Sequence, residues 1–418
     1  MAKTCQTLGM TALPAAACAT EVHGFTPEPC VLLKLGEIVL KGRNRRQFER
    51  LLQNNIRLAA ADLGVGLRLW QRDGVIVLSP TSLPPGLSAQ SAADQIADRM
   101  LTVMGVVRVC RASRVAKDPQ AAIEAAADLA KDKAGSFAVR AKRRDKRFAL
   151  TSAELAIAIG SRVREFYGNP VNLSKPDFSI CLEVDQSEVF VYTDGRAGQG
   201  GLPVGMSGRG LVLMSGGIDS PVAGYRMMRR GLHCSFLHFS GMPLTGPESV
   251  YKAYGLVRQL DKYQRGSRLY VIAFGRAQQR LASSGSGKLQ IMAQRRLMLK
   301  TAQAMAARVR ATALVTGDSL GQVSSQTLAN ITALDEAVEL PILRPLIGLD
   351  KTEIMAEARR ISTLALSELP DQDCCSLLLP RHVETRARVA DLHKIEARLE
   401  IDELAAELAA AAQEYRPG

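Results

Sequence analysis

The feature that constrains this chain most is the run LVLMSGGIDS at residues 211–220. Its first four residues are apolar and predict an interior strand of a parallel sheet, and a turn rich in glycine and hydroxyl groups follows at once. Residues 221–230 then predict a helix with a basic last turn. The turn therefore lies at a helix N-terminus, where backbone N–H groups, the helix dipole and the hydroxyls of Ser215 and Ser220 favour an oxyanion.

Two familiar phosphate motifs are absent from the sequence. Without Gly-Lys-Ser/Thr there is no Walker loop, and without Gly-x-Gly-x-x-Gly followed by an acidic residue a dinucleotide fold is unsupported. The pattern Ser-Gly-Gly-x-Asp-Ser after a strand instead resembles the pyrophosphate loop of ATP pyrophosphatases, which adenylate a substrate oxygen and release pyrophosphate. An ordinary strand-to-helix turn has no structural need for Asp219, which favours the catalytic interpretation.

The composition indicates a globular protein with an anionic partner. The 418 residues are enough for two to four domains, and 54 Lys and Arg against 41 Asp and Glu give a net charge of +13. Such an excess favours a polyanion such as nucleic acid. No stretch approaches the roughly 20 apolar residues that span a bilayer. The eight cysteines lack metal-site spacing and predict reduced thiols in a cytoplasmic protein.

Residues 1–27 faintly resemble a signal peptide, but Pro14 interrupts an already short apolar stretch. They are therefore expected to be a disordered extension or the product of a start site placed too early. Residues 28–90 predict a small α+β unit that ends at a proline-rich boundary. Its expected elements are a strand over 30–40, an amphipathic helix to about residue 63, and a strand pair at 68–70 and 75–78.

Residues 91–195 predict a second α+β unit. Helices are expected at 91–103, 120–132 and 152–166, and strands near 106–112, 136–141, 178–184 and 188–193. Six of the eight residues in the run 140–147 are cationic, and the apolar strand before them would fix these charges on a surface suited to phosphates. The candidate RNA-binding residues are Arg140, Lys142, Arg143, Arg144, Lys146 and Arg147.

Residues 196–418 predict an α/β domain with a parallel sheet, joined to the preceding unit by a glycine-rich stretch at 195–210. Further strands are expected at 234–239, 269–274 and 313–316, and helices at 247–261 and 288–308. Ligands in such sheets lie beyond the carboxyl ends of the strands, where Ser215, His238 and Gly317 fall. A helix over 387–411 is expected to serve packing, through Leu392, Ile395, Leu399, Leu404 and Leu408 on one face.

Several segments together resemble the tRNA 4-thiouridine synthetases, or ThiI tRNA sulfurtransferases. They are residues 33–45, the pyrophosphate loop, and residues 294–299, 314–328, 340–348 and 371–375. The resemblance implies a ferredoxin-like domain at 28–90, a THUMP RNA-binding domain at 91–195 and, at 196–418, an adenine nucleotide alpha hydrolase-like domain. It also implies the short form of the family, without a C-terminal rhodanese domain.

The resemblance further implies an ATP site with Mg²⁺ and no resident metal held by the protein. Asp219 would position Mg²⁺ or a phosphate-bound water, and either Arg295 or Arg296 would offset developing negative charge. Residues 240–243 differ from the aromatic-rich family version. The implied phosphate-binding residues are Ser215, Gly216, Gly217, Asp219 and Ser220, and the implied ATP contacts are Leu213, Met214, His238, Phe239, Arg295, Gly317 and Gln326.

The implied reaction replaces the C4 oxygen of uridine 8 in tRNA with sulfur. The nucleophile would be a persulfide on Cys374 or Cys375, with Cys374 favoured by its spacing to Pro380. The implied partners are tRNA, a cysteine desulfurase, a thiamine sulfur-carrier protein and a second copy of the chain. Two alternatives stay open: another thiolating or amide-forming enzyme of the superfamily, and a non-catalytic adaptor, against which Asp219 argues.

Overall fold

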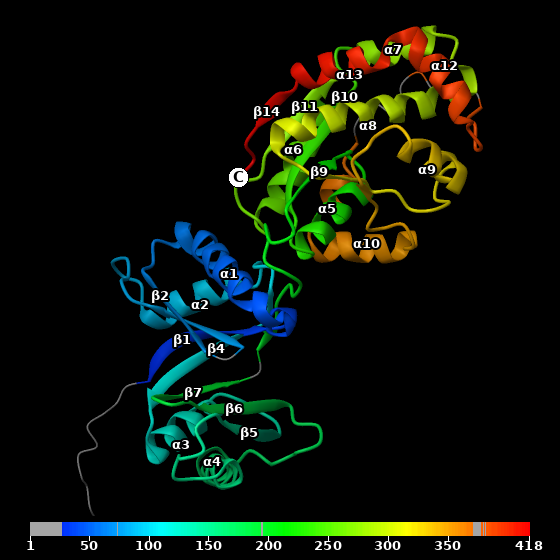
Figure 1. The fold of residues 1–418 in the computed structure, drawn as a ribbon. Coiled ribbons are helices and arrows are strands. Elements are labelled where there is room, and N and C mark those ends of the chain that lie inside the picture. The colour runs from blue at the N-terminus through cyan, green and yellow to red at the C-terminus, as the bar shows by residue number, and fades with distance from the viewer. Residues whose placement is uncertain (1–26, 73, 194, 371–377, 379, 381) are drawn as a thin grey trace, which may run out of the picture. The chain divides into compact units, whose positions relative to one another are not determined.

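The computed structural model describes residues 27–72, 74–193, 195–370, 378, 380 and 382–418. They fall into two compact units (Figure 1). Of the described residues, unit 1 holds 27–28 and 113–193, and unit 2 holds 29–112 and those from 195 to 418. The chain thus leaves unit 2, builds most of unit 1 and returns.

The first part of unit 2 is a sheet in the order β2-β3-β1-β4, against which α1 and α2 pack. The buried residues of both helices, such as Ile56 and Ile96, share one core with Val31 and Leu33 of β1. The boundary expected at residues 90–91 therefore falls inside α2, which packs with the preceding residues. The bounds are β1 Glu28–Leu35, α1 Arg45–Ala60, β2 Leu67–Arg72, β3 Val75–Pro80, α2 Ala89–Met100 and β4 Val106–Ala116.

The expected strand over 30–40 is too long, because β1 ends at Leu35. A Cβ on Gly36 would lie 2.3 Å from the side chain of Val107, so the chain approaches its neighbour closely there and turns away. Two short 3₁₀ turns, Glu37–Leu40 and Gly42–Asn44, follow and lead into α1.

Unit 1 packs helices α3 and α4 on one face of the strands β7-β6-β5. Side chains alternate across a strand, so Val139 and Ala141 face the helices while Arg140 and Lys142 lie on the other face. A capping box between Thr151 and Glu154 starts α4. The bounds are α3 Pro119–Asp128, β5 Phe137–Arg143, α4 Ser152–Tyr167, β6 Phe178–Val184 and β7 Glu188–Thr193.

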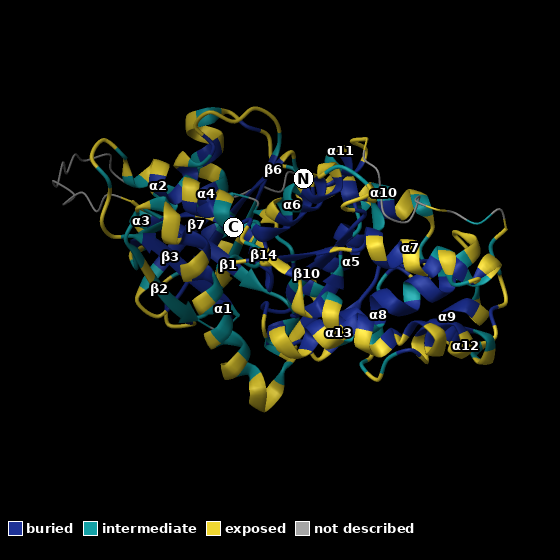
Figure 2. Cartoon of the chain, turned by 90° about the horizontal axis from the view of Figure 1, so that it is seen from above, coloured by how far each residue is buried: buried dark blue, intermediate teal, exposed yellow. Residues whose placement is uncertain are grey.

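The rest of unit 2 is a sheet in the order β13-β12-β9-β10-β11-β14, parallel except for β14. One core places α5, α6 and α10 on one face, and another places α7, α8, α12 and α13 on the other. Figure 2 shows the buried strands between these helix layers. This three-layer arrangement confirms the expected α/β class. The strands are β9 Arg209–Leu213, β10 His233–Ser240, β11 Leu269–Ala273, β12 Ala313–Val315, β13 Ile342–Leu343 and β14 Gln413–Tyr415.

The helices expected at 247–261 and 288–308 are confirmed within two residues, and the structure adds helices that the sequence analysis did not predict. They are α5 Asp219–Arg229, α6 Glu248–Asp261, α7 Gly275–Ser283, α8 Gln290–Val309, α9 Leu328–Asp335, α10 Lys351–Arg360, α11 Leu364–Ser367, α12 Val389–Leu399 and α13 Ile401–Ala410. The single helix expected over 387–411 is wrong, because Glu400 adopts a left-handed φ of 50° and ends α12. Both halves still pack against α8, as expected of a packing element.

The glycine-rich stretch after residue 195 is packed rather than extended. The N–H of Gly105 donates to the Gly200 carbonyl at 2.7 Å, and a Cβ on Gly201 would lie 2.0 Å from the Arg229 carbonyl oxygen. Glycine is required there by close approach of the backbone to the end of α5. No helix in the described part of the chain is long and apolar enough to cross a membrane.

Candidate active site

The loop between β9 and α5 is braced by its own hydroxyl groups. The N–H of Ser215 donates to Ser220 Oγ at 3.0 Å, the two hydroxyls lie 3.1 Å apart, and the N–H of Gly217 donates to Ser215 Oγ at 3.3 Å. The first N–H groups of α5 have no acceptor within the helix and are directed to the same place. The loop therefore has the geometry of an anion-binding turn.

Gly317, just after β12, closes one side of this loop. A Cβ at Gly317 would lie 2.9 Å from the Ser220 nitrogen and 3.1 Å from the Asp219 Cβ. No larger residue fits without displacing the start of α5. Two of the three strand ends that the sequence analysis placed at the ligand edge of the sheet thus meet at this loop.

Asp219 holds two donors that the sequence analysis missed. Lys351 Nζ lies 2.7 Å from Asp219 Oδ1, and Gln322 Nε2 donates to Oδ2 at 3.1 Å. Lys351 is the first residue of α10, whose capping box at Asp350 and Glu353 marks a third strand-to-helix turn. That turn follows β13, which is parallel to β12, so its position at the same sheet edge could have been inferred.

A second carboxylate, Asp318, joins the arginine and glutamine implied as ATP contacts. Arg295 and Gln326 both donate to its Oδ1, at 2.5 and 3.2 Å. Thr316 and Arg344 donate to Oδ2, at 2.8 and 3.3 Å. Burial alone would raise the pKa of Asp318, but Arg295, Thr316 and Arg344 outweigh it and hold that pKa below its usual value. The ionised carboxylate thus fixes Arg295 and Gln326 in place.

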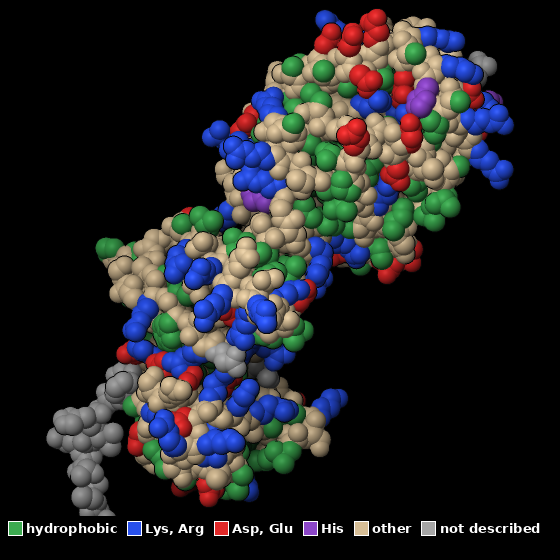
Figure 3. Space-filling model, viewed as in Figure 1, with side chains coloured by type: hydrophobic (Ala, Val, Ile, Leu, Met, Phe, Trp, Pro, Cys, Tyr) green, Lys and Arg blue, Asp and Glu red, His purple; other side chains and the backbone are tan. Residues whose placement is uncertain are grey.

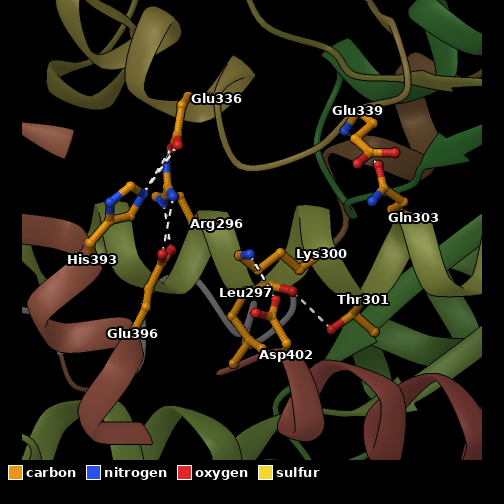
Figure 4. A network of polar contacts seen from close by, with 10 residues as sticks. All are labelled: Arg296, Leu297, Lys300, Thr301, Gln303, Glu336, Glu339, His393, Glu396 and Asp402. Atoms are coloured by element: carbon orange, nitrogen blue, oxygen red, sulfur yellow. Dashed lines mark hydrogen bonds and ion pairs between the residues drawn. The ribbon is translucent and has the colours of Figure 1, made fainter. Parts of the chain in front are cut away.

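The structure separates the two arginines that the sequence left as alternatives. Arg295 is partly exposed beside Asp318, whereas the side chain of Arg296 is 1% exposed on the other side of α8. Its guanidinium contacts Glu396 at 2.5 Å and Glu336 at 2.8 Å, as Figure 4 shows. It also donates to the Ala333 carbonyl. Arg296 therefore belongs to packing, and Arg295 alone faces the loop edge.

His238 is a buried connecting residue. Its Nδ1 lies 2.9 Å from the Met214 carbonyl oxygen and its Nε2 lies 3.2 Å from Ser249 Oγ. These contacts tie the end of β9 to α6 and favour the expected non-catalytic role of His238. Phe239 is also buried, against Phe274, at a ring distance of 5.2 Å. Contacts of these residues with a nucleotide would therefore come from the strand-end backbone.

Cys374 and Cys375 lie outside the described residues, but the chain on either side of them is anchored. Ser367 Oγ donates to the Gly217 carbonyl at 3.4 Å, and Lys252 Nζ donates to the Leu369 carbonyl at 2.6 Å. On the far side, Gln290 Nε2 donates to the Leu378 carbonyl at 2.6 Å. The anchor before Cys374, through Ser367, thus contacts the pyrophosphate loop itself.

The basic run of unit 1 divides into fixed and exposed residues. Arg143 donates to the Phe148 and Leu150 carbonyls, at 3.2 and 3.0 Å, and so holds the loop. The Arg144 Nη2 atom lies 3.6 Å from Glu183 Oε2, which makes an ion pair. Exposed on the surface are Arg140, Lys142, Lys146 and Arg147, the last of which also pairs with Asp145.

Three family models match the chain. The ThiI ferredoxin-like domain matches residues 30–110, the THUMP domain matches 119–194, and the model described as thiamine biosynthesis protein (ThiI) matches 205–401. The first of these spans includes α2, in agreement with its packing.

The curated relatives match along nearly the whole chain. A protein named "Probable tRNA sulfurtransferase" from Nocardia farcinica is 49% identical over 383 residues, which is 90% of this chain and 91% of that protein. This chain belongs to the ThiI tRNA sulfurtransferase family. A ThiI relative of the same name from Thermus thermophilus is 40% identical over 371 residues, 88% of this chain and 89% of that one.

Two solved structures share the fold. The crystal structure of a 4-thiouridine synthetase–RNA complex with bound ATP superposes with a TM-score of 0.83 at 28% identity, over 93% of this chain and 99% of that chain. PH1313 from Pyrococcus horikoshii, with a TM-score of 0.62 at 23% identity over 80% of this chain and 99% of that chain, supports the fold alone.

Proposed function

We propose that this protein is an ATP-dependent tRNA sulfurtransferase that adenylates uridine 8 and replaces its C4 oxygen with sulfur to give 4-thiouridine. The observation that carries the proposal is the hydroxyl-braced loop, with Asp219, Lys351 and Arg295 around it, in a member of the ThiI family. The ATP and RNA in the related 4-thiouridine synthetase structure support the same substrates here.

Activation is needed because a uridine C4 oxygen is a poor leaving group. Attack of that oxygen on the α-phosphate forms the adenylated uridine and breaks the bond to pyrophosphate. Ser215, Gly217 and Ser220 would hold the departing phosphates by N–H and hydroxyl donors. Lys351 and Arg295 place positive charge at the same edge, where negative charge develops on pyrophosphate.

Mg²⁺ fits this site only together with the nucleotide. Asp219 supplies one carboxylate, and in the described part of the chain no group of three or more His, Cys, Asp or Glu side chains could hold a metal ion. Magnesium usually binds through one or two carboxylates plus substrate phosphates. Asp219 would hold it at the pyrophosphate, where the ion would neutralise phosphate charge.

The sulfur step is assigned to the terminal sulfur of a persulfide on Cys374. That sulfur attacks C4, and AMP leaves with the former C4 oxygen. A thiolate, from Cys375 or an external thiol, then attacks Cys374 Sγ and breaks the sulfur–sulfur bond, which releases 4-thiouridine and leaves a disulfide to be reduced. Buried Cys234 is unsuited to the role, because burial raises its pKa to about 12.

The proposal extends to the partners of the enzyme. The exposed cations of unit 1, Arg140, Lys142, Lys146 and Arg147, would contact tRNA phosphates, with Arg143 and Arg144 supporting their loop. A cysteine desulfurase would load the persulfide in the cytoplasm, and the enzyme would act as a homodimer. The description of the family model as a thiamine biosynthesis protein favours a second role in sulfur transfer to a carrier protein.

Thionucleoside analysis tests the sulfur step. Unmodified tRNA is incubated with ATP, Mg²⁺, cysteine, a desulfurase and either the parent protein, Cys374→Ser, Cys375→Ser or the control Cys181→Ser. We expect Cys374→Ser to make no 4-thiouridine, and the control to match the parent. If both Cys374→Ser and Cys375→Ser keep the parent rate, covalent sulfur transfer is wrong.

Pyrophosphate release tests the first step separately. A sulfurtransferase releases pyrophosphate from ATP in a tRNA-dependent manner even when Cys374 is serine, because adenylation precedes sulfur attack. An adaptor with a vestigial loop releases none.

A further inference from the structure

The turn at residues 319–326, between β12 and α9, directs one polar side chain to Asp219 and leaves two apolar side chains at the surface. Gln322 Nε2 donates to Asp219 Oδ2 at 3.1 Å. On either side of Gln322, Leu320 is 52% exposed and Val323 is 51% exposed. Figure 3 shows hydrophobic side chains on the surface of unit 2 in the region of α5, α9 and α10. The turn thus places an amide group and apolar surface together beside the pyrophosphate loop.

Backbone hydrogen bonds give this turn a defined shape. The N–H of Gly321 donates to the Gln326 carbonyl at 2.9 Å, and the N–H of Leu320 donates to the Ile347 carbonyl at 3.0 Å. Gly321 adopts a left-handed φ of 73°, which glycine tolerates without strain. The backbone therefore holds the apolar side chains of the turn at the surface.

The contact with Asp219 fixes the orientation of the Gln322 amide. A carboxylate oxygen only accepts hydrogen bonds, so the NH₂ group faces Asp219 and Oε1 faces away from it. Lys351 Nζ holds the other oxygen of Asp219 at 2.7 Å, so the carboxylate is fixed from two sides. No donor in the described part of the chain reaches Gln322 Oε1. This oxygen is therefore a fixed acceptor for a donor from outside the chain.

The two substrates of the proposed function offer different groups to this acceptor. The phosphate oxygens of ATP are themselves acceptors and do not pair with it. A uracil ring carries a donor, N3–H, next to its C4 oxygen, and it has two apolar faces that suit Leu320 and Val323. Cytosine has a nitrogen without hydrogen at the same place, which an acceptor repels. The turn thus matches uracil among the pyrimidines.

We infer that Gln322, with Leu320 and Val323 beside it, forms the site for the uracil ring of the target nucleotide, and that Gln322 Oε1 accepts the hydrogen bond from N3–H. The inference rests on the proposed function for the identity of the base. Gln322 is then a specificity-determining residue that leaves the C4 oxygen close to Asp219. When that oxygen bonds to the α-phosphate, C4 and N3 gain a double bond and the N3 proton leaves to water, which reaches this exposed turn.

A substrate without the N3–H donor tests the contact directly. Two full-length tRNAs are assembled, one with uridine at position 8 and one with 3-deazauridine, whose ring keeps the C4 oxygen but has C–H in place of N3–H. The measured quantity is the preference for uridine in kcat/KM of tRNA-dependent pyrophosphate release. We expect this preference to be about tenfold smaller in Gln322→Leu than in the parent, because one hydrogen bond is lost. Differences in intrinsic reactivity between the two bases are the same in both proteins and cancel.

Two further variants separate recognition of the base from support of Asp219. Gln322→Lys keeps a donor for Asp219 but has no acceptor, so it should lose the preference for uridine as Gln322→Leu does. The control Gln279→Leu changes an exposed glutamine of α7 and should keep the preference of the parent. Because Gln322 is exposed, the thermal unfolding midpoint of Gln322→Leu should match that of the parent.

If either Gln322→Leu or Gln322→Lys keeps the parent's preference for uridine, the inference is wrong, and Gln322 serves only to orient Asp219. The inference is also wrong if Gln322→Leu changes only the KM for ATP, and equally with both tRNAs, since the amide would then contact the nucleotide. A parent protein that releases no pyrophosphate with the uridine tRNA would overturn the proposed function itself, and this inference with it.

Discussion

Two neighbouring arginines on α8 serve opposite regions of unit 2. Arg295 reaches the open edge of the sheet, where its side chain is 21% exposed, while Arg296 reaches a closed cluster with Glu336, Glu396 and His393 (Figure 4). The closed cluster sets Arg296, which is 1% exposed, against the carboxylates of Glu336 and Glu396. At the open edge, Lys351 and Arg295 pair with Asp219 and Asp318 but keep 41% and 21% of their side chains exposed, so an arriving polyphosphate finds cations that are fixed but still accessible.

The contrast between Arg295 and Arg296 shows that charge alone does not identify a functional residue. Arg296 has the stronger internal partners and is inaccessible, so it contributes to stability. Arg295 is held by one buried carboxylate and two weaker contacts to Ser325, which leaves part of its guanidinium open. Substitutions at the two positions should therefore separate stability from activity.

The largest expected effect is on folding, from Arg296→Met. This change leaves Glu396 buried without its cation, which costs about 3–5 kcal/mol in the free energy of unfolding. Urea unfolding followed by circular dichroism measures it, with the exposed Arg398→Met as control. The double variant Arg296→Met/Glu396→Leu should recover much of the loss, because it removes both charges; no recovery would mean that the pair is not the cause.

The next effect is on catalysis, from Arg295→Met. Loss of one fixed cation at a developing phosphate charge lowers rates by about 10²-fold in comparable sites. We expect tRNA-dependent pyrophosphate release to fall by this amount while the urea midpoint stays near that of the parent, because Arg344 and Thr316 still hold Asp318. A large fall in stability with normal activity in the folded fraction would reverse the roles assigned to Arg295 and Arg296.

The comparison also shows what the sequence could predict. The strand before residue 215, the loop and the helix after it follow from a local pattern of apolar, glycine and hydroxyl residues, and all lie where expected. The alternation of strands and helices likewise predicted the parallel sheet. These features depend on neighbours in sequence, which is why they can be recognised there.

Features set by distant residues could not be recognised. Nothing local distinguishes Arg295 from Arg296; only their contacts with Asp318 and with Glu396, 100 residues further along the chain, separate them. The pairing of Lys351 with Asp219, 132 residues away, could not be recognised, although the strand-to-helix turn that carries Lys351 could have been. The break at Glu400 was missed because the apolar pattern continues across it. The placement of Cys374 and Cys375 stays a prediction.

A smaller effect is expected from Asp318→Asn, which tests whether the open edge is preorganised. An amide keeps the shape but removes the charge that fixes Arg295 and Gln326, so ATP should bind about tenfold more weakly, equivalent to about 1.4 kcal/mol. Pyrophosphate release at varied ATP concentration measures the change in KM. Unchanged KM with a lower kcat would mean that Asp318 acts on the reacting groups rather than on binding.

The smallest effect concerns the rim of the closed cluster, where Glu336 is 44% exposed. Burial alone would raise its pKa, but contacts with Arg296 and His393 outweigh burial and hold that pKa below the usual 4.5. A depressed folded-state pKa means that Glu336 stabilises the fold above about pH 4.5 and loses this contribution as the pH falls through the folded-state value. Because solvent screens the pair, Glu336→Gln should cost under about 1 kcal/mol at pH 7 in urea unfolding, and the difference from the parent should shrink below pH 4.5. If the difference in the free energy of unfolding between parent and variant grew on acidification, the protonated form of Glu336 would be the one that stabilises the folded cluster.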